Sequence, residues 1–164
     1  MTVPTMVRSD ITDRADVYAL LSRFYGQALI DDVLAEPFSE VRAKGLDEHL
    51  PVMCDFWETM LLRARLYQRS ALEVHREVHL KHPLTHEHFL RWLTLWVETV
   101  DAMFSGPVAE KAKLHGRRTA WAFHRRLTGH DVPELDAAAL PTPRAGVSPG
   151  DRPQNLRGLR TLAQ

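Results

Sequence analysis

The chain has 164 residues, of which 45% are hydrophobic and 26% charged, and its 21 basic residues balance its 21 acidic residues. This length suffices for one domain with a substantial core. Zero net charge argues against a general attraction to nucleic acid or to an anionic membrane. The single cysteine, Cys54, excludes a disulfide within the chain. Because the first residues lack the apolar run of a secretory signal and no apolar stretch approaches the ~20 residues of a membrane span, we expect a cytoplasmic protein.

The first half of the sequence predicts two long helices joined by a short link. Residues 13–30 carry an apolar stripe at helical spacing. A weakly helical link lies between Pro37 and Gly45. From Asp47 a second long helix is expected, in which Pro51 is tolerated because it falls in the first turn. The expected buried face of this helix consists of Met53, Phe56, Trp57, Met60, Leu61 and Ala64.

The second half predicts three further helices. Residues 71–80 form a short helix that Pro83 cuts off, and Thr85 is suited to cap the next one. That next helix has the strongest apolar stripe in the chain. The sequence Gly106-Pro107 ends it and begins a last helix that continues to Gly129. The stripe consists of Phe89, Trp92, Leu93, Trp96, Val100, Met103 and Phe104. Because no alternating β-branched run appears, the predicted fold class is all-α.

The composition changes after Gly129. Half of the ten prolines fall between residues 132 and 153, mixed with alanine, arginine and glycine. We therefore expect one helical domain over residues 1–130 and a Pro/Arg/Ala-rich, mobile tail over residues 131–164.

Histidines and polar-ended aromatics are the candidate functional residues. His75, His79 and His82 are spaced by four and three residues, so one helix face can carry all three. Two such imidazoles can bind zinc, but HREVH places its glutamate differently from the HExxH motif and no cysteine pair completes a site. A zinc hydrolase is therefore disfavoured. The aromatic set comprises Tyr25, His49, Trp57, Trp92 and Trp96, and it fits either an ordinary helical core or a pocket with polar groups.

Four segments carry a resemblance to a known family. They are RFYGQALID at 23–31, EHLPVMCDFWETML at 48–61, ALEVH at 71–75 and HFLRWLTLW at 88–96. In this order and approximate spacing they resemble the third group of the truncated haemoglobins, over about residues 14–127. The resemblance implies a truncated globin-like helical sandwich around a pocket for haem b.

The resemblance also implies roles for individual residues. His75, at the end of ALEVH, corresponds to the proximal ligand of the haem iron. Because the link from His75 to Phe89 is about three residues longer than in compact family members, His79 is a rival ligand. Tyr25, His49 and Trp92 correspond to distal residues whose N–H and O–H groups face a bound ligand.

A second set of residues is implied in binding the macrocycle. Phe24 corresponds to a phenylalanine that packs near the haem, and Met53 and Phe56 fall one and two turns beyond the distal histidine. Arg63, Arg65 and Arg76 are candidate partners of the haem propionates.

The resemblance therefore implies that the protein binds haem and uses it to bind O2 and other small ligands, namely NO, CO, cyanide or peroxide. Three distal donors would hold an anionic ligand too firmly for transport and favour redox or detoxification chemistry with an unidentified electron donor. Nitric oxide dioxygenase-like and peroxidase-like activities both remain open. The alternative is a haem-free helical interaction module that uses the basic last helix, RRTAWAFHRRL at 117–127, and the proline-rich tail.

Overall fold

The structure is a computed structural model that describes residues 7–67 and 70–135. It contains the helices α1 (Arg14–Ala28), α2 (Ser39–Lys44), α3 (Leu46–Leu62), α4 (Ala71–Lys81), α5 (His86–Met103) and α6 (Pro107–Thr128). No strand occurs within these residues, so the predicted all-α class is confirmed. None of these helices combines the length and hydropathy of a membrane-spanning segment.

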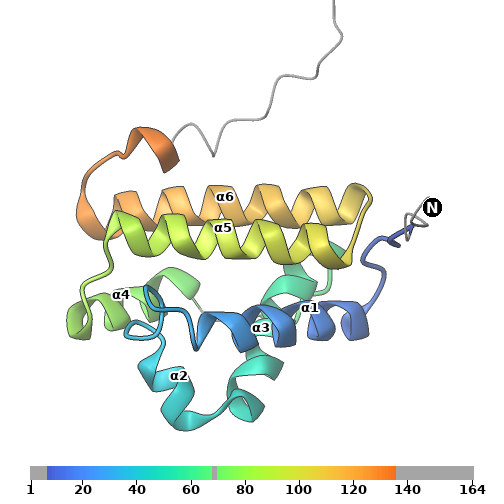
Figure 1. Cartoon of the computed structure of the whole chain (residues 1–164), viewed down its shortest axis with the longest axis horizontal. Helices are drawn as coiled ribbons and strands as arrows, with labels where there is room; N and C mark the ends of the chain where they lie inside the picture. The colour runs from blue at the N-terminus through green and yellow to red at the C-terminus, as the bar shows by residue number, and fades with distance from the viewer. Residues whose placement is uncertain (1–6, 68–69, 136–164) are drawn as a thin grey trace, which may run out of the picture.

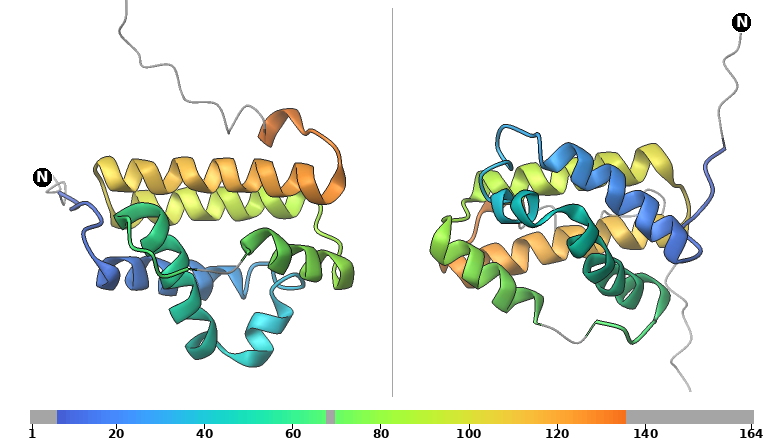
Figure 2. Two further views of the ribbon diagram at one scale, coloured as in Figure 1. Left: turned by 180° about the vertical axis from the view of Figure 1, so that it is seen from behind. Right: turned by 90° about the horizontal axis from the view of Figure 1, so that it is seen from below.

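The helices form two layers. The long helices α5 and α6 run antiparallel beside each other, and α1, α3 and α4 lie across one face of that pair (Figure 1). Seen from behind, α3 crosses α1 steeply near one end of the α5–α6 pair, while α4 lies toward the other end (Figure 2). Helices α3 and α4 therefore pack on different parts of α6.

Local signals account for most helix ends. The Asp13 side chain caps α1 by accepting from the N–H of Asp16, and Ser70 caps α4 in the same way. Thr85 forms a capping box with His88 at the start of α5, which confirms the prediction that Thr85 caps this helix. The turn at Gly106 has φ +143°, a conformation that favours glycine, so α5 and α6 separate where Gly106-Pro107 predicts it.

Helix α3 corrects two sequence-based predictions. It begins at Leu46, so Pro51 lies in its second turn rather than its first. The bond that Pro51 cannot donate would go to the carbonyl of Asp47, and both residues are exposed, so water can replace it. Ala64 lies beyond the helix end at Leu62, and Met60 is 38% exposed. The predicted buried face was therefore wrong at Met60 and Ala64.

The fully buried positions of α3 are Leu50, Cys54, Trp57 and Leu61. These residues face the core that α3 shares with α1 and α5. Positions 49, 53, 56 and 60 form the adjacent face, because residues three and four apart lie over one another on a helix. Helix α3 thus presents one face to the core and a partly buried second face that begins at His49.

The core consists of two clusters that meet at Trp92. One cluster joins α1, α3 and the middle of α5, and the other joins Phe89 and Leu93 of α5 to Ala120 of α6. Trp92 packs against both clusters. Leu135 is 0% exposed in the second cluster, so packing continues beyond residue 130. The domain boundary after residue 130 stays a prediction, and residues 136–164 of the expected tail lie outside the described residues.

Candidate functional site

His75 is anchored through one ring nitrogen. Its Nδ1 atom lies 2.7 Å from the carbonyl oxygen of Ala71, one turn earlier in α4. A carbonyl can only accept a hydrogen bond, so Nδ1 carries the proton, and in the neutral ring Nε2 keeps its lone pair. Burial lowers the pKa of His75, which favours this neutral form. The ring also contacts Phe123 of α6, with ring centroids 4.8 Å apart. These features suit His75 to bind a metal through Nε2.

His79 is bonded in the opposite sense. Its Nδ1 atom accepts a hydrogen bond of 2.9 Å from the backbone N–H of Leu84. The neutral ring must then carry its proton on Nε2, which leaves neither nitrogen with a free lone pair. The hydrogen bonds therefore favour His75 over His79 as a ligand. Residues 82–85, which follow α4, are exposed or half-buried except at the buried Leu84.

Tyr25 and His49 form the polar part of the site on the side of α1 and α3. Their ring centroids are 4.8 Å apart and the rings are nearly perpendicular. Tyr25 is 5% exposed, and burial raises the pKa of its hydroxyl, which keeps the group protonated. The Nε2 atom of His49 is buried and has no hydrogen-bond partner within residues 7–67 and 70–135. A buried polar atom without a partner carries a cost of about 1–3 kcal/mol, so it marks a place suited to a ligand.

The charge of His75 acts on His49. Burial lowers the pKa of His49, and the positive charge of a protonated His75 lowers it further. The imidazoles of α3 and α4 are thus within electrostatic reach of each other. Helix α3 supplies one imidazole with an unpartnered Nε2 and α4 supplies another with an available Nε2.

The two tryptophans of α5 have different roles. Trp96 is 0% exposed, and its indole N–H donates to the carbonyl oxygen of Ala112 at 3.1 Å. Trp92 is only partly buried, and its N–H makes no hydrogen bond within the described part of the chain. The Trp92 ring is held edge-on to Phe24, with centroids 5.8 Å apart. Trp92, and not Trp96, therefore has an N–H available for a ligand.

Three apolar side chains border this region. Phe24 is buried and meets the rings of Tyr25 and Trp96 edge-on. Met53 and Phe56 lie on the same face of α3 as His49, and both are partly buried against the core. The face of α3 that carries His49 therefore also carries partly buried apolar side chains.

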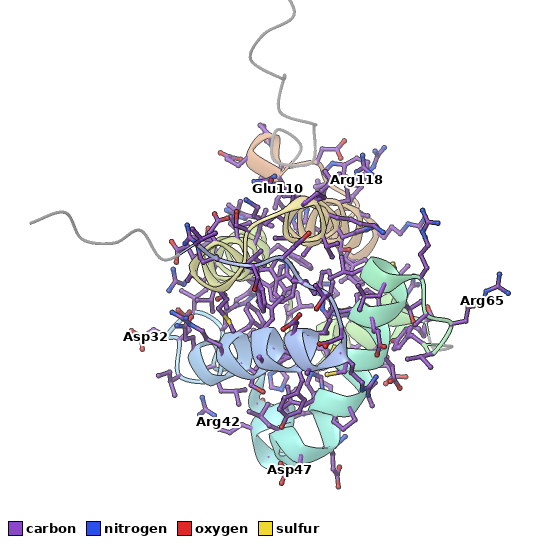
Figure 3. The ribbon with its side chains drawn as sticks, turned by 90° about the vertical axis from the view of Figure 1, so that its right-hand side faces the viewer. Asp32, Arg42, Asp47, Arg65, Glu110 and Arg118 are labelled. Carbon is purple, nitrogen blue, oxygen red and sulfur yellow. The ribbon has the colours of Figure 1, made fainter. Side chains whose placement is uncertain are left out.

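The candidate propionate partners lie at the surface. Arg63 ends α3 in the left-handed conformation, with φ 59°, and it is exposed. Arg65 points away from the body of the protein (Figure 3). Arg76 is exposed on α4 and lies 3.6 Å from Glu73. The structure does not bring these arginines together with the imidazoles.

The zinc hypothesis gains no support from the described residues. Within them, no three His, Cys, Asp or Glu side chains are grouped so as to hold a metal ion. His75 and His79 use their Nδ1 atoms in different hydrogen bonds, with Ala71 and Leu84. Their spacing of four residues on one helix face therefore does not produce a shared site.

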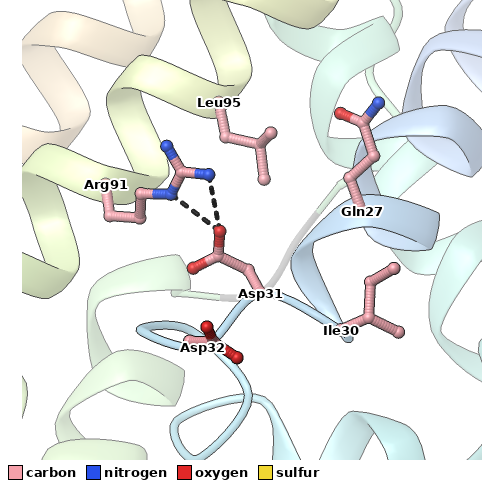
Figure 4. Close-up of a pocket in the computed structure, with 6 residues that line it drawn as sticks. All are labelled: Gln27, Ile30, Asp31, Asp32, Arg91 and Leu95. Carbon is pink, nitrogen blue, oxygen red and sulfur yellow. Dashed lines mark hydrogen bonds and ion pairs between the residues drawn. The ribbon is translucent and has the colours of Figure 1, made fainter.

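Two contacts near the site were not predicted. Phe123 packs on the His75 ring from α6. Asp31, just after α1, forms an ion pair with Arg91, the residue before Trp92 (Figure 4). Both contacts join segments far apart in the sequence, and neither residue pair has a spacing or a motif that would reveal it. The only available signal was the position of Arg91 beside Trp92.

The fold is similar to that of a known haem protein. No protein-family model matches the sequence, and no curated protein matches it. Among solved structures, the group III truncated haemoglobin from Campylobacter jejuni matches with a TM-score of 0.66 and 21% sequence identity. The match covers 74% of this chain and 95% of the other. At this identity the likeness concerns the fold, and the chain has the truncated-globin fold that its sequence segments predict.

Proposed function

We propose that this protein binds haem b between α3 and α4 and uses it to bind O2 and related small ligands. His75 would hold the iron through Nε2, because its Nδ1 is already committed to Ala71. The observation that carries the proposal is the buried Nε2 of His49, which lacks a hydrogen-bond partner within the described residues. The truncated-globin fold supports the same assignment.

The residues present fit the group. A flat apolar macrocycle needs apolar walls, one neutral imidazole below and polar groups only where its ligand binds. Met53 and Phe56 offer partly buried apolar side chains on the face of α3 that carries His49, and the buried Phe24 meets the rings of Tyr25 and Trp92 edge-on. Arg63 and Arg76 are exposed, and each could pair with a propionate at the rim.

When bound, the haem supplies an iron with one open coordination position for a small ligand. The chain supplies the donors around that position. Tyr25 O–H, the His49 imidazole and Trp92 N–H are three groups without hydrogen-bond partners in the described residues. Because they lie on three different helices, their positions are fixed by tertiary packing before a ligand arrives, which is the condition for effective electrostatic stabilisation.

The strength of the hydrogen bonds from these donors to a ligand decides between transport and redox chemistry. A hydrogen bond to a charged acceptor contributes about 1.5–3 kcal/mol, and about 1.4 kcal/mol changes an equilibrium tenfold. Two such donors would slow the release of a partly anionic ligand by orders of magnitude. We therefore propose redox or detoxification chemistry, either nitric oxide dioxygenase-like or peroxidase-like, in preference to O2 transport. The electron donor would be a separate protein or small molecule.

The test is to titrate the purified full-length protein with haemin. We expect stoichiometric uptake, a Soret band and the ferrous spectrum of a single histidine ligand. A protein that takes up no haemin would overturn the proposal. Iron and zinc analysis of the protein as isolated provides an independent check.

The alternative, a haem-free interaction module, has one supporting observation. Helix α6 carries Arg118, Arg125 and Arg126 at exposed positions, although Arg125 lies 3.5 Å from Asp131. The other half of that proposed surface falls in residues 136–164, outside the described residues. The haemin titration separates the two functions.

A further inference from the structure

The carboxylate of Asp31, which is ion-paired with Arg91, accepts more hydrogen bonds than the carboxylate of any other ion pair in the described chain. One carboxylate oxygen of Asp31, Oδ2, accepts from Arg91 Nε at 2.7 Å and lies 2.6 Å from Arg91 Nη2 (Figure 4). The other oxygen, Oδ1, accepts from the backbone N–H groups of Val33 and Leu34. The Asp31 side chain is 11% exposed and that of Arg91 is 40% exposed. The carboxylate therefore fixes a loop and a helix at once.

The pair joins the two segments that carry distal donors. Asp31 follows α1, whose last two turns hold Phe24 and Tyr25, and Arg91 immediately precedes Trp92 on α5. Those segments also meet through the edge-on approach of Phe24 to Trp92 and Trp96. An aromatic edge contact restrains distance but tolerates sliding, whereas two guanidinium N–H groups that converge on one carboxylate oxygen restrain direction as well.

We propose that Asp31 and Arg91 are positioning residues that hold Trp92 in register with Tyr25, so that both donors face one ligand. The proposal rests on the distal roles proposed above for Tyr25 and Trp92. This positioning role accounts for the location of the pair, which lines a shallow surface pocket of about 350 Å³ between α1 and α5. The pair stabilises the arrangement of the site and does not touch the ligand.

The first test measures the position of Trp92 without reference to haem. In Asp31→Asn, the side-chain oxygen can still accept from the backbone of Val33 and Leu34, while the charge facing Arg91 is lost. The full-length protein is labelled with 5-fluorotryptophan, and Trp92→Phe and Trp57→Phe each assign one of the four tryptophan signals. We expect Asp31→Asn to shift or broaden the Trp92 signal and to leave that of Trp57 in place.

Asp32→Asn is the matched control. Asp32 is adjacent in sequence and lines the same pocket, but it is not bonded to Arg91 (Figure 4). We expect its Trp92 signal to equal that of the unmodified chain. An unchanged Trp92 signal in Asp31→Asn, or an equal change in Asp32→Asn, would overturn the proposal. Arg91→Met, which keeps an apolar stem, should reproduce the effect of Asp31→Asn, and Arg91→Lys should partly restore the signal.

The second test is a double-mutant cycle on the haem-loaded protein. Asp31→Asn should raise the O2 dissociation rate by about threefold to tenfold, the range expected when one hydrogen bond to the ligand is weakened. In the Trp92→Phe background the same substitution should have almost no effect, because the donor it positions is gone. Fully additive effects would overturn the positioning role.

The two tests separate the proposals. If the fluorine signal of Trp92 moves in Asp31→Asn but Trp92→Phe leaves ligand dissociation unchanged, the positioning role stands and the distal role of Trp92 fails. If the protein takes up no haemin, the proposed function fails, and the fluorine experiment on the haem-free chain still decides whether the ion pair positions Trp92.

Discussion

The Nδ1 atom of His75 donates to the carbonyl oxygen of Ala71, while the Nδ1 atom of His79 accepts from the N–H of Leu84. Two histidines on one short helix are thereby fixed in opposite tautomers. His75 and His79, which the sequence spacing leaves equivalent, therefore differ in the ring nitrogen that carries the proton. Of these two, only His75 has a ring nitrogen free to bind a metal while the ring is neutral.

The first prediction concerns this distinction. His75→Gly should lose haem retention by orders of magnitude, and added imidazole should restore a ligand to the vacated space. His79→Gly should retain haem, because the ring it removes serves only the turn before Leu84. The measurement is the rate of haem transfer to an excess of a haem-free acceptor globin. Faster transfer from His79→Gly than from His75→Gly would move the ligand to His79.

The second prediction concerns the cost of the unpartnered imidazole. His49→Leu removes a buried nitrogen without a partner in the described residues, so it should raise the free energy of unfolding of the haem-free chain by about 1 kcal/mol. The same substitution should speed ligand dissociation from the haem-loaded protein, because a donor is lost. Such opposite effects are typical of residues kept for function at the expense of stability.

Ser22→Ala is the matched control for His49→Leu. The Ser22 hydroxyl is also buried without a partner in the described part of the chain, but it belongs to none of the proposed distal groups. This substitution should raise the free energy of unfolding in urea and leave ligand dissociation unchanged. A loss of stability in His49→Leu would show that its imidazole has a stabilising partner.

The third prediction concerns acid stability. Burial, and next the charge of His86, lower the pKa of His124 below its ordinary value of 6.5. A hydrogen bond to the backbone of His130 and the charge of Asp131 raise this pKa, and the charge of His130 lowers it. The unfolded chain therefore binds a proton at His124 at a higher pH than the folded chain does, and stability falls as pH drops below about 6.5.

Removing the His124 imidazole should reduce the pH dependence of the unfolding free energy. His124→Leu should show a smaller loss of unfolding free energy between about pH 7 and pH 5 than the unmodified chain. At about pH 8 the imidazole is neutral in both states, so any difference there reports packing alone. Urea unfolding at each pH provides the measurement, and parallel curves for the two proteins would contradict the assignment.

The fourth prediction concerns two helical glycines with opposite surroundings. At Gly26 in α1 nothing lies within 4 Å of the position that a Cβ atom would occupy, so Gly26→Ala should stabilise the protein by about 0.5–1 kcal/mol through helix propensity. At Gly116 a Cβ atom would lie 2.6 Å from Cδ1 of Trp96. Because Trp96 is fully buried and bonded to Ala112, it cannot move aside, and Gly116→Ala should destabilise by about 1–3 kcal/mol. Thermal and urea unfolding would measure both, and equal shifts would contradict the prediction.

Helix positions could be predicted from the sequence because their signals are local. The start of α5 follows from a cap at Thr85, and its end follows from Gly106-Pro107, each within one turn of the boundary. The start of α3 was harder to place, since no side chain caps it and Pro51 suggested a later beginning. The family segments supplied the fold and the candidate residues, and the structural likeness bears out the fold.

The sequence by itself determined that this chain is helical and where most of its helices lie, and it named the candidate side chains of the site. Only the tertiary structure decided which of those side chains are available. Trp96 and Trp92 look alike in sequence, but α6 brings the Ala112 carbonyl to Trp96 alone. Asp31 is bonded to Arg91, which lies 60 residues later in the sequence. Helix boundaries depend on hydrogen bonds within a few residues, whereas a free donor or an ion pair depends on which distant segments fold against it.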